Sequence, residues 1–440
     1  MKNAHRESER GQALVLLAMG MAVLLGIAGL AIDGGNLYAH KRHAQNAVDN
    51  AALAYALALN QNKASAGLAQ ANSVLADNGY VNGQDNAAIT IARGPAGFDD
   101  SYIEVTLTGT VPTAFIHLVY DGPAAFTVRA VAHGQPSAAP MAGYAIIGLA
   151  DCTTAGGHNV GMSGGGNSGS INVHNGDIFL NSPENGASPQ QRCALNPPNS
   201  NGNQGITVDS GHQIMSVGSY NYSDSPYISP SPIATGANGG TPVSDPLASL
   251  EPPTCTGNGT VNTGAEPDVY SPGNWEGHDL GPGTYQPGIY CISDSDVSLS
   301  GSQTIVGNGV VFYFVDHGLK ITGQAGITLT APSATTSPGC LGDADSTSSS
   351  CHYAGMAIFV ARGNTSTIDV RGNGGTALTG TIYAPTATVQ AKGGGSDPDE
   401  TAMVGQIIAS SVVNAGNGSL DLTYVEDKVY HLPPYIQLVE

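Results

Sequence analysis

The amino-terminal part of the chain opens with a long apolar run and continues with an Ala-rich pattern. Residues 13–32 read ALVLLAMGMAVLLGIAGLAI and contain no charged side chain. As a helix this run rises about 30 Å, which is enough to span the hydrocarbon core of a bilayer. The stretch after the pair Gly34-Gly35 is rich in Ala and Leu and has no Pro. It predicts a second helix that ends near Asn78-Gly79.

Three further runs, at residues 88–92, 102–110 and 125–132, predict β-strands. The middle run, YIEVTLTGT, alternates apolar and polar side chains, which is the pattern of a half-buried strand. Together with the preceding helix, these runs predict a small module of one helix on a short sheet. The module ends at a stretch, GQPSAAP, that is typical of a linker.

The remainder of the chain consists of short β-prone runs separated by Gly, Asn, Ser and Asp. The clearest runs lie at residues 303–305, 310–315, 319–322, 327–330, 357–360, 367–370, 378–383, 387–390, 405–411 and 420–424. Short runs with tight corners favour a chain that winds repeatedly round one axis, because stacked coils share one continuous core. We therefore expect a right-handed parallel β-helix-like domain, with a β-sandwich as the alternative.

These patterns predict a mainly β protein with five segments along its 440 residues. They are a cytoplasmic tail (1–12), a transmembrane helix (13–32), a helix plus short β-sheet module (33–134), a linker (135–141) and a Gly-rich β-helix-like extracytoplasmic domain (142–440).

Composition and charge support this division. Charged residues make up 11% of the chain, and it holds 60 Gly and 26 Pro, which suits many tight turns better than a helix-rich enzyme. The net charge of −20, with only 14 Lys and Arg, excludes a nucleic-acid partner, because phosphate binding needs clustered cations. The acidic surface favours solubility in an extracellular medium, and binding of divalent cations such as calcium is the alternative.

The charges that flank the apolar run indicate its orientation. Lys2, Arg6 and Arg10 precede it and Asp33 follows it. The positive-inside rule then predicts a short cytoplasmic tail and an external remainder. A cleaved signal peptide is the alternative, with small residues for cleavage at residues 29–31, although the apolar run is longer than a signal core.

Small residues recur on one face of this predicted membrane helix. Ala18, Ala22 and Gly26 are spaced four apart, so they share one face and could let another helix approach closely.

The cysteines all follow the apolar run, and their number is even. This arrangement predicts disulfides in an oxidising compartment. Sequential pairing would join Cys152 to Cys193, Cys255 to Cys291 and Cys340 to Cys351, with other connectivities open. The pair that flanks the Ser-rich loop, Cys340 and Cys351, is the best supported by sequence.

The amino-terminal residues also resemble a known family. Residues 10–13 read RGQA, residues 31–35 read AIDGG, residues 38–42 read YAHKR and residues 45–54 read QNAVDNAALA. This order is similar to the amino-terminal region of TadG-like proteins of the tight-adherence (Flp-type) pilus system. Three later phrases, SDPLASLEPPTC, PGTYQPGIYC and GTIYAPTATV, are similar to the carboxyl-terminal regions of such proteins. The resemblance implies a membrane or envelope component of pilus assembly or adhesion with a β-helical surface domain.

One position departs from the pilin pattern. If processing followed Gly11, the place where pilins carry Glu would be Leu16. This departure argues against polymerisation as a pilin subunit.

Candidate chemistry is sparse in the sequence. No convincing nucleophile elbow or His-Glu-x-x-His pattern is present, and the 12 His are scattered. Asp316, Asp369, Glu400 and Asp421 would be the carboxylates of a polysaccharide-cleaving enzyme, the least favoured of the functions considered. We therefore predict no catalytic, cofactor-binding or metal-ligating residue.

Two further features leave binding open. Acidic clusters at residues 294–296, 343–345 and 397–400 favour solvated loop charges over calcium, because none has EF-hand spacing. Trp275, near Tyr270 and His278, is predicted as a core residue, with a sugar-stacking patch as the alternative.

The sequence thus predicts a non-enzymatic, single-pass membrane protein that contributes to Flp/Tad-type pilus assembly or surface adhesion. Its predicted partners are the lipid bilayer and other pilus-assembly or envelope proteins, and no cofactor is expected. A secreted or surface glycan-binding adhesin is the alternative.

Overall fold

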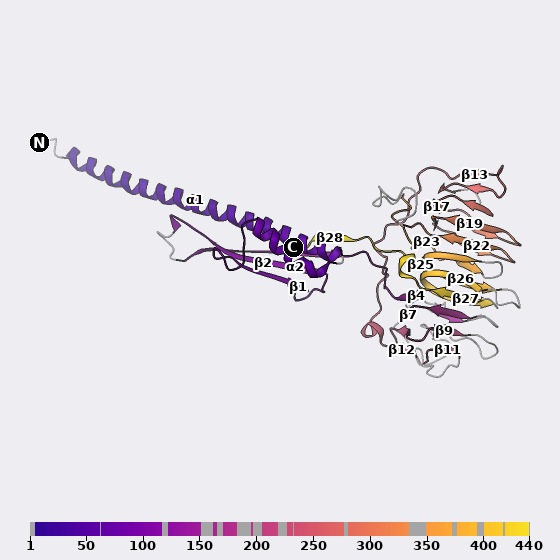
Figure 1. The fold of residues 1–440 in the computed structure, drawn as a ribbon. Helices are drawn as coiled ribbons and strands as arrows, with labels where there is room; N and C mark the ends of the chain where they lie inside the picture. Colours follow the sequence, from indigo (N-terminus) through magenta and orange to yellow (C-terminus); the bar gives the residue numbers. More distant parts are fainter. Residues whose placement is uncertain are drawn as a thin grey trace. The chain divides into compact units, whose positions relative to one another are not determined.

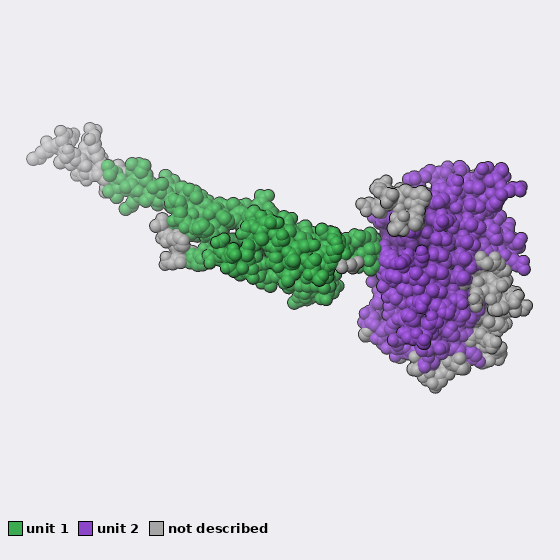
Figure 2. Space-filling model, in the orientation of Figure 1, with its two compact units in different colours: residues 1–138, 432–440 green, residues 139–431 purple. Residues whose placement is uncertain are grey.

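The computed structural model divides the chain into two compact units (Figure 2). Unit 1 comprises residues 1–138 and 432–440, and unit 2 comprises residues 139–431. The structure describes residues 5–61, 63–116, 122–150, 162–164, 170–182, 195–196, 205–218, 227–231, 233–276, 280–333, 349–371, 376–393, 400–416 and 419–439. The boundary near residue 138 lies inside the predicted linker. The return of residues 432–440 to unit 1 differs from the prediction, which placed them in the Gly-rich domain.

Unit 1 is built on one long helix, α1 (His5–Asn60), followed by the shorter α2 (Ala64–Asp77). The predicted break at Gly34-Gly35 is wrong, because α1 continues through both residues. A Cβ at either glycine would meet nothing within 4 Å. A glycine inside a helix costs only about 0.5–1 kcal/mol relative to Ala, and packing of the following Ala-rich stretch offsets this cost.

The sheet of unit 1 is antiparallel, in the order β1 (Ala88–Arg93), β2 (Tyr102–Val111), β3 (Ala124–Gln135) and β28 (Tyr435–Leu438). Its first three strands confirm the predicted runs. One face covers the second half of α1 in a shared core. That core includes Ala44, Ala47, Val48, Ala51, Tyr55, Ile103, Val105, Leu107, Phe126 and Val128. The fourth strand was missed because its short sequence, YIQL, is largely exposed and lacks an alternating burial pattern.

Among its described residues, unit 2 has many short strands and two 3-10 turns, Ala237–Gly240 and Glu426–Lys428. Its strands are β4 (Tyr144–Gly148), β5 (Met162–Gly164), β6 (Ile171–His174), β7 (Asp177–Leu180), β8 (Leu195–Asn196), β9 (Ile206–Val208), β10 (Ile214–Ser216), β11 (Ile228–Ser229), β12 (Ala234–Thr235), β13 (Val261–Asn262), β14 (Val269–Tyr270), β15 (Gly273–Asn274), β16 (Gly283–Tyr285), β17 (Gly288–Ile292), β18 (Val297–Leu299), β19 (Thr304–Asn308), β20 (Val310–Phe314), β21 (Leu319–Ile321), β22 (Gly326–Thr330), β23 (Met356–Val360), β24 (Ile368–Arg371), β25 (Ala377–Gly393), β26 (Glu400–Gly416) and β27 (Ser419–Thr423).

Many strands of unit 2 pair in parallel with the strand three places further along. Examples are β16 with β19, β17 with β20, β18 with β21, and β4 with β7. This pairing is that of stacked coils, as expected for a β-helix-like domain. The sandwich alternative is disfavoured, because sandwiches are built from antiparallel sheets. A right-handed coil stays a prediction.

The core of unit 2 is a ladder of large apolar side chains that continues from coil to coil. Register partners in this ladder are Tyr290, Phe312, Ile358, Ile382, Ile407, Ile146, Ile178 and Ile214. All of them are fully buried. Burial of one such side chain contributes about 1.5–3 kcal/mol, so the ladder is a large part of what holds the coils together.

The chain does not wind from one end of the stack to the other in sequence order. Strand β4 stacks on β26, so the first coils lie next to the last ones (Figure 1). Coils β4 to β12 extend to one end of the stack. Residues 244–255 then lead to the opposite end at β13, and the chain winds back to β25, β26 and β27. Residues 244–255 are called the crossing segment below.

Candidate functional site

The carboxylate of Asp33 holds the turn that follows β2. Its two oxygens accept hydrogen bonds from three consecutive backbone N–H groups, those of Ala114 (3.0 Å), Phe115 (2.7 Å) and Ile116 (2.6 Å). Only 4% of Asp33 is exposed. An isolated buried carboxylate is costly, and consecutive backbone N–H donors remove most of that cost. Asp33 therefore joins α1 to the far end of the sheet.

Two further residues of α1 contact the same turn. A Cβ on Gly29 would lie 2.5 Å from Cγ of Phe115, so only glycine lets this ring pack against the helix backbone. Asn36 donates from Nδ2 to the carbonyl oxygen of Pro112 at 3.3 Å. Gly29, Asp33 and Asn36, together with residues 112–116, are called the junction site. Gly29, Asp33 and Asn36 share one helix face, because they are spaced four and three residues apart.

The junction site lies where the environment of α1 changes. Between Leu14 and Asn36, whose side chains are all described, Gly29 and Asp33 alone are buried. Nearly every large apolar side chain between Leu14 and Ile32 is well exposed on the isolated protein. By length and composition, α1 can cross a membrane. The junction site therefore marks where the uncovered apolar segment meets the folded module.

The predicted small-residue face is also uncovered. Ala18, Ala22 and Gly26 are exposed, and a Cβ on Gly26 would meet nothing within 4 Å. At about 100° per residue, these positions lie on the same side of α1 as Gly29 and Asp33. Packing of a second helix on this face stays a prediction.

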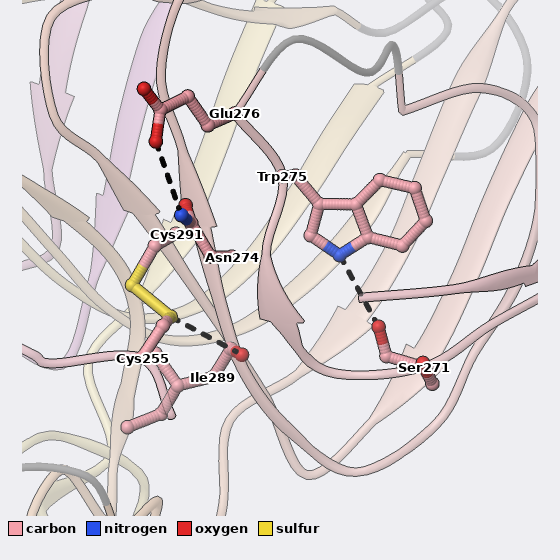
Figure 3. Close-up of a disulfide and its surroundings, with 7 residues drawn as sticks. All are labelled: Cys255, Ser271, Asn274, Trp275, Glu276, Ile289 and Cys291. Carbon is pink, nitrogen blue, oxygen red and sulfur yellow. Dashed lines mark hydrogen bonds between the residues drawn. A yellow bond between two sulfur atoms is a disulfide. The ribbon is translucent and has the colours of Figure 1, made fainter. Parts of the chain in front are cut away.

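The structure confirms the predicted disulfide between Cys255 and Cys291 (Figure 3). The two cysteines are separated by 36 positions, and the bond ties the crossing segment to β17. Sγ of Cys255 lies 3.8 Å from the carbonyl oxygen of Ile289. Cys351 is also disulfide-bonded. Cys152, Cys193 and Cys340 lie outside the described residues, so their pairing stays a prediction.

Trp275 is a core residue, as predicted, and its ring is unavailable for sugar stacking. Only 2% of it is exposed. Its Nε1–H donates to the carbonyl oxygen of Ser271 at 3.2 Å (Figure 3). Its backbone N–H donates to the carbonyl oxygen of Cys291 at 2.9 Å. A Cβ on Gly259 would lie 2.0 Å from Nε1, so the indole packs directly on backbone.

The crossing segment is held at successive levels of the coil stack. Near β7, Asn181 exchanges two hydrogen bonds with the backbone of Val243, at 2.9 and 2.7 Å, just before the crossing segment begins. Further along, Arg362 donates from Nη2 to the carbonyl oxygens of Leu247 and Leu250, both at 2.6 Å. These contacts explain a structural role for the phrase SDPLASLEPPTC.

Tyr383, on β25, also contacts the crossing segment and Arg362. Its hydroxyl donates to the Asp245 carboxylate, and Nε of Arg362 lies 3.0 Å from the same hydroxyl. Burial, reinforced by the Asp245 carboxylate, raises the pKa of Tyr383 well above its usual value of 10.0. Tyr383 therefore stays a neutral donor at physiological pH.

Two of the carboxylates considered for catalysis, Asp316 and Asp421, lie in different coils. Asp316 follows β20 and Asp421 lies on β27, and β20 reaches β27 only through β23, β25 and β26. Asp369 is buried on β24. Asp421 instead faces His174, with Oδ1 2.9 Å from Nε2. The side chain of Glu400 lies outside the described residues.

The acidic clusters are described only in part. Asp296 pairs with Lys320 and lies 3.7 Å from Nδ1 of His317. Clusters 343–345 and 397–399 lie outside the described residues. Within the part of the chain that the structure describes, no group of three or more His, Cys, Asp or Glu could hold a metal ion.

The sequence located Asp33 but missed its role. Asp33 entered the prediction as a flanking charge and as part of the AIDGG phrase, and Gly29 as a possible cleavage residue. A useful signal was present, because Gly29 and Asp33 lie four residues apart on one helix face. The partner turn, residues 112–116, has no sequence pattern that predicts its contact with a helix so far away along the chain.

Comparisons with known proteins identify two regions. Residues 11–58 match the family described as "Putative Flp pilus-assembly TadE/G-like". Residues 284–427, from the end of β16 to the second 3-10 turn, match a domain of unknown function (DUF7305). No curated protein and no solved structure matches the chain. The first match covers the membrane-spanning candidate, the junction-site residues of α1 and the helix surface beneath the sheet. The chain therefore carries a TadE/G-like amino-terminal region of the Flp pilus-assembly type, joined to a β-rich unit of which residues 284–427 match a domain of unknown function.

Proposed function

We propose that this protein is a non-enzymatic, membrane-anchored component of a Flp/Tad-type pilus system whose β-domain lies outside the cytoplasmic membrane. The observation that supports this most directly is the continuity of α1. Its first half exposes an apolar surface that the described chain covers only at Gly29, and its second half packs beneath the sheet. A helix with these two environments suits an anchor that carries a folded module at the membrane surface.

The proposed orientation rests on charge and disulfides. Lys2, Arg6 and Arg10 precede the apolar run, which favours a cytoplasmic amino terminus. The Cys255–Cys291 disulfide belongs to the opposite side of the run, where an oxidising compartment would maintain it. The protein would contribute to pilus assembly or attachment through contacts of its acidic β-domain and its membrane helix.

The test is protease shaving of intact cells that carry an epitope tag in unit 2, combined with mass spectrometry of the mature amino terminus. We expect a full-length, membrane-bound protein whose tag is removed from outside, while a cytoplasmic marker stays intact. Where an outer membrane blocks the protease, its selective permeabilisation is the matched condition. A soluble, released protein that begins near Ile32 would overturn the anchor.

A second test addresses the pilus system itself. Deletion of the gene should reduce pilus display or surface attachment, and the full-length gene should restore it. Normal pilus display and attachment in the deletion strain would contradict the proposed role.

A further inference from the structure

The turn at residues 112–116 lies against the apolar part of α1, beyond the sheet that it connects. Phe115 packs on Gly29, three residues before the apolar run ends at Ile32. At 1.5 Å per residue, this contact lies about 4.5 Å inside the apolar end of the helix. Phe115 nonetheless remains 41% exposed. An exposed aromatic ring at this depth would face lipid rather than water.

Backbone polar groups normally prevent a turn from lying at this depth. In the hydrocarbon edge of a bilayer, each unsatisfied N–H group costs several kcal/mol. Here the N–H groups of Ala114, Phe115 and Ile116 are all satisfied by Asp33. The same bonds satisfy the carboxylate, whose burial at a membrane edge would otherwise be unfavourable. The three hydrogen bonds therefore satisfy the N–H groups of the turn and the carboxylate of Asp33 at the same time.

We propose that residues 113–116 form a membrane foot, in which Phe115 inserts into the headgroup–acyl boundary of the bilayer that holds α1. Asp33 is the positioning residue, because it satisfies and orients the turn. The occupant of this surface is lipid, since Phe115 packs on Gly29 inside the apolar run, and Leu30 and Ile32 at the same level of α1 are exposed as well. Aromatic side chains are enriched at this level of membrane proteins. The inference rests on the proposed membrane anchor.

The chain contains a matched control for Phe115. Phe98 is 38% exposed, a nearly equal fraction, and it lies in the connection between β1 and β2. Phe115 follows the other end of β2, a strand of 10 residues. At about 3.3 Å per residue, the strand separates the two rings by about 33 Å. A membrane foot should therefore place Phe115 in lipid and Phe98 in water.

The experiment uses the full-length protein in phosphatidylethanolamine/phosphatidylglycerol vesicles, with acyl chains brominated near the headgroup as quenchers. Phe115→Trp, Phe98→Trp and Val23→Trp are compared. Trp275 serves as a constant internal reference, because it is buried in unit 2. We expect the added emission of Val23→Trp and Phe115→Trp to be quenched, and that of Phe98→Trp to be unchanged.

The outcomes separate the foot from the anchor. Quenching of Val23→Trp without quenching of Phe115→Trp would overturn the foot and leave the anchor in place. Equal quenching of Phe98→Trp and Phe115→Trp would also overturn it, since the whole module would then lie on the membrane. Absence of quenching in all three variants would overturn the anchor as well.

A second comparison tests the role of Asp33. Asp33→Ala in the Phe115→Trp background should release the turn and lower the quenching. Asp49→Ala is the control, because Asp49 lies on the same helix and accepts a hydrogen bond from Gln45 instead of from the turn. Unchanged quenching in Asp33→Ala would show that Asp33 does not position Phe115.

Discussion

Gly405 lies directly against Gly380, so closely that a Cβ on Gly405 would be 2.0 Å from the carbonyl oxygen of Gly380. The two glycines are register partners in the parallel pair β25 and β26. Both have positive φ, 132° for Gly380 and 154° for Gly405, which other residues rarely adopt. Two adjacent coils thus approach through a backbone contact that no side chain could replace.

Gly405→Ala should therefore destabilise unit 2. The strained φ alone costs about 1–3 kcal/mol, and the clash with Gly380 adds to it. Urea denaturation followed by the emission of Trp275, the one Trp in the chain, measures the loss. Gly363→Ala is the control, since a Cβ there meets nothing within 4 Å. Equal midpoints for the two variants would contradict the prediction.

Arg362→Met should loosen the crossing segment. The substitution removes the donors to Leu247 and Leu250. Hydrogen bonds that involve a charged group contribute about 1.5–3 kcal/mol each, so we expect a loss of at least about 2 kcal/mol in local stability. The rate of chymotrypsin cleavage at Leu247 and Leu250 measures it. Lys320→Met, which breaks an exposed ion pair with Asp296, should leave the cleavage rate unchanged.

Removal of the Cys255–Cys291 bond should destabilise the coils around β17. The bond closes a loop across a sequence separation of 36. A loop of this length predicts about 4 kcal/mol from chain entropy. Replacement of both cysteines by Ser should lower the urea midpoint and shift the Trp275 transition with it, because the backbone of Trp275 is bonded to Cys291. A midpoint equal to that of the oxidised wild type would contradict this.

Acidification should weaken unit 1 through His133. This ring stacks on Tyr102 with centroids 4.0 Å apart, and its Nδ1 lies 2.6 Å from Oη of Tyr435. Burial lowers the pKa of His133 from its usual value of 6.5, and Asp99 opposes this shift. As pH falls below 6.5, the unfolded chain binds a proton that the folded chain does not, so the free energy of unfolding decreases.

The measurement is the thermal midpoint of unit 1 between about pH 8 and about pH 5, where the His133 contribution should be lost progressively. His133→Phe keeps an aromatic ring but cannot titrate. Its midpoint should fall less steeply over the same pH range. Parallel pH curves for wild type and His133→Phe would show that another group is responsible.

The sequence predicted local elements well, because each depends on nearby residues. The apolar run, the three strands of the module and the β-prone runs of unit 2 all correspond to elements of the structure. The continuity of α1 at Gly34-Gly35 was not predictable from these residues alone, since distant packing decides whether a glycine pair ends a helix. The stacking of Ile146 on Ile407 could not be predicted from the sequence for a similar reason. The parallel register joins residues that lie near opposite ends of the sequence of unit 2.

The junction site shows the same limit. The sequence indicates that Asp33 and Gly29 are unusual positions, but their partner, Phe115, is contributed by a turn without a pattern of its own. The disulfide between Cys255 and Cys291 was predictable because sequential pairing is a simple rule. The role of the crossing segment was not, since Asn181, Arg362 and Tyr383 come from three separate coils.

The return of β28 makes unit 2 an insertion in the sequence of unit 1. Its two ends leave and re-enter through neighbouring strands, and Ala138 and Leu432 form a bridge between them. The inserted domain could therefore be replaced by another one, in evolution or by design, while the strands of unit 1 stay paired. The same double attachment means that residues 432–439, although they follow the inserted domain in sequence, complete the sheet of unit 1.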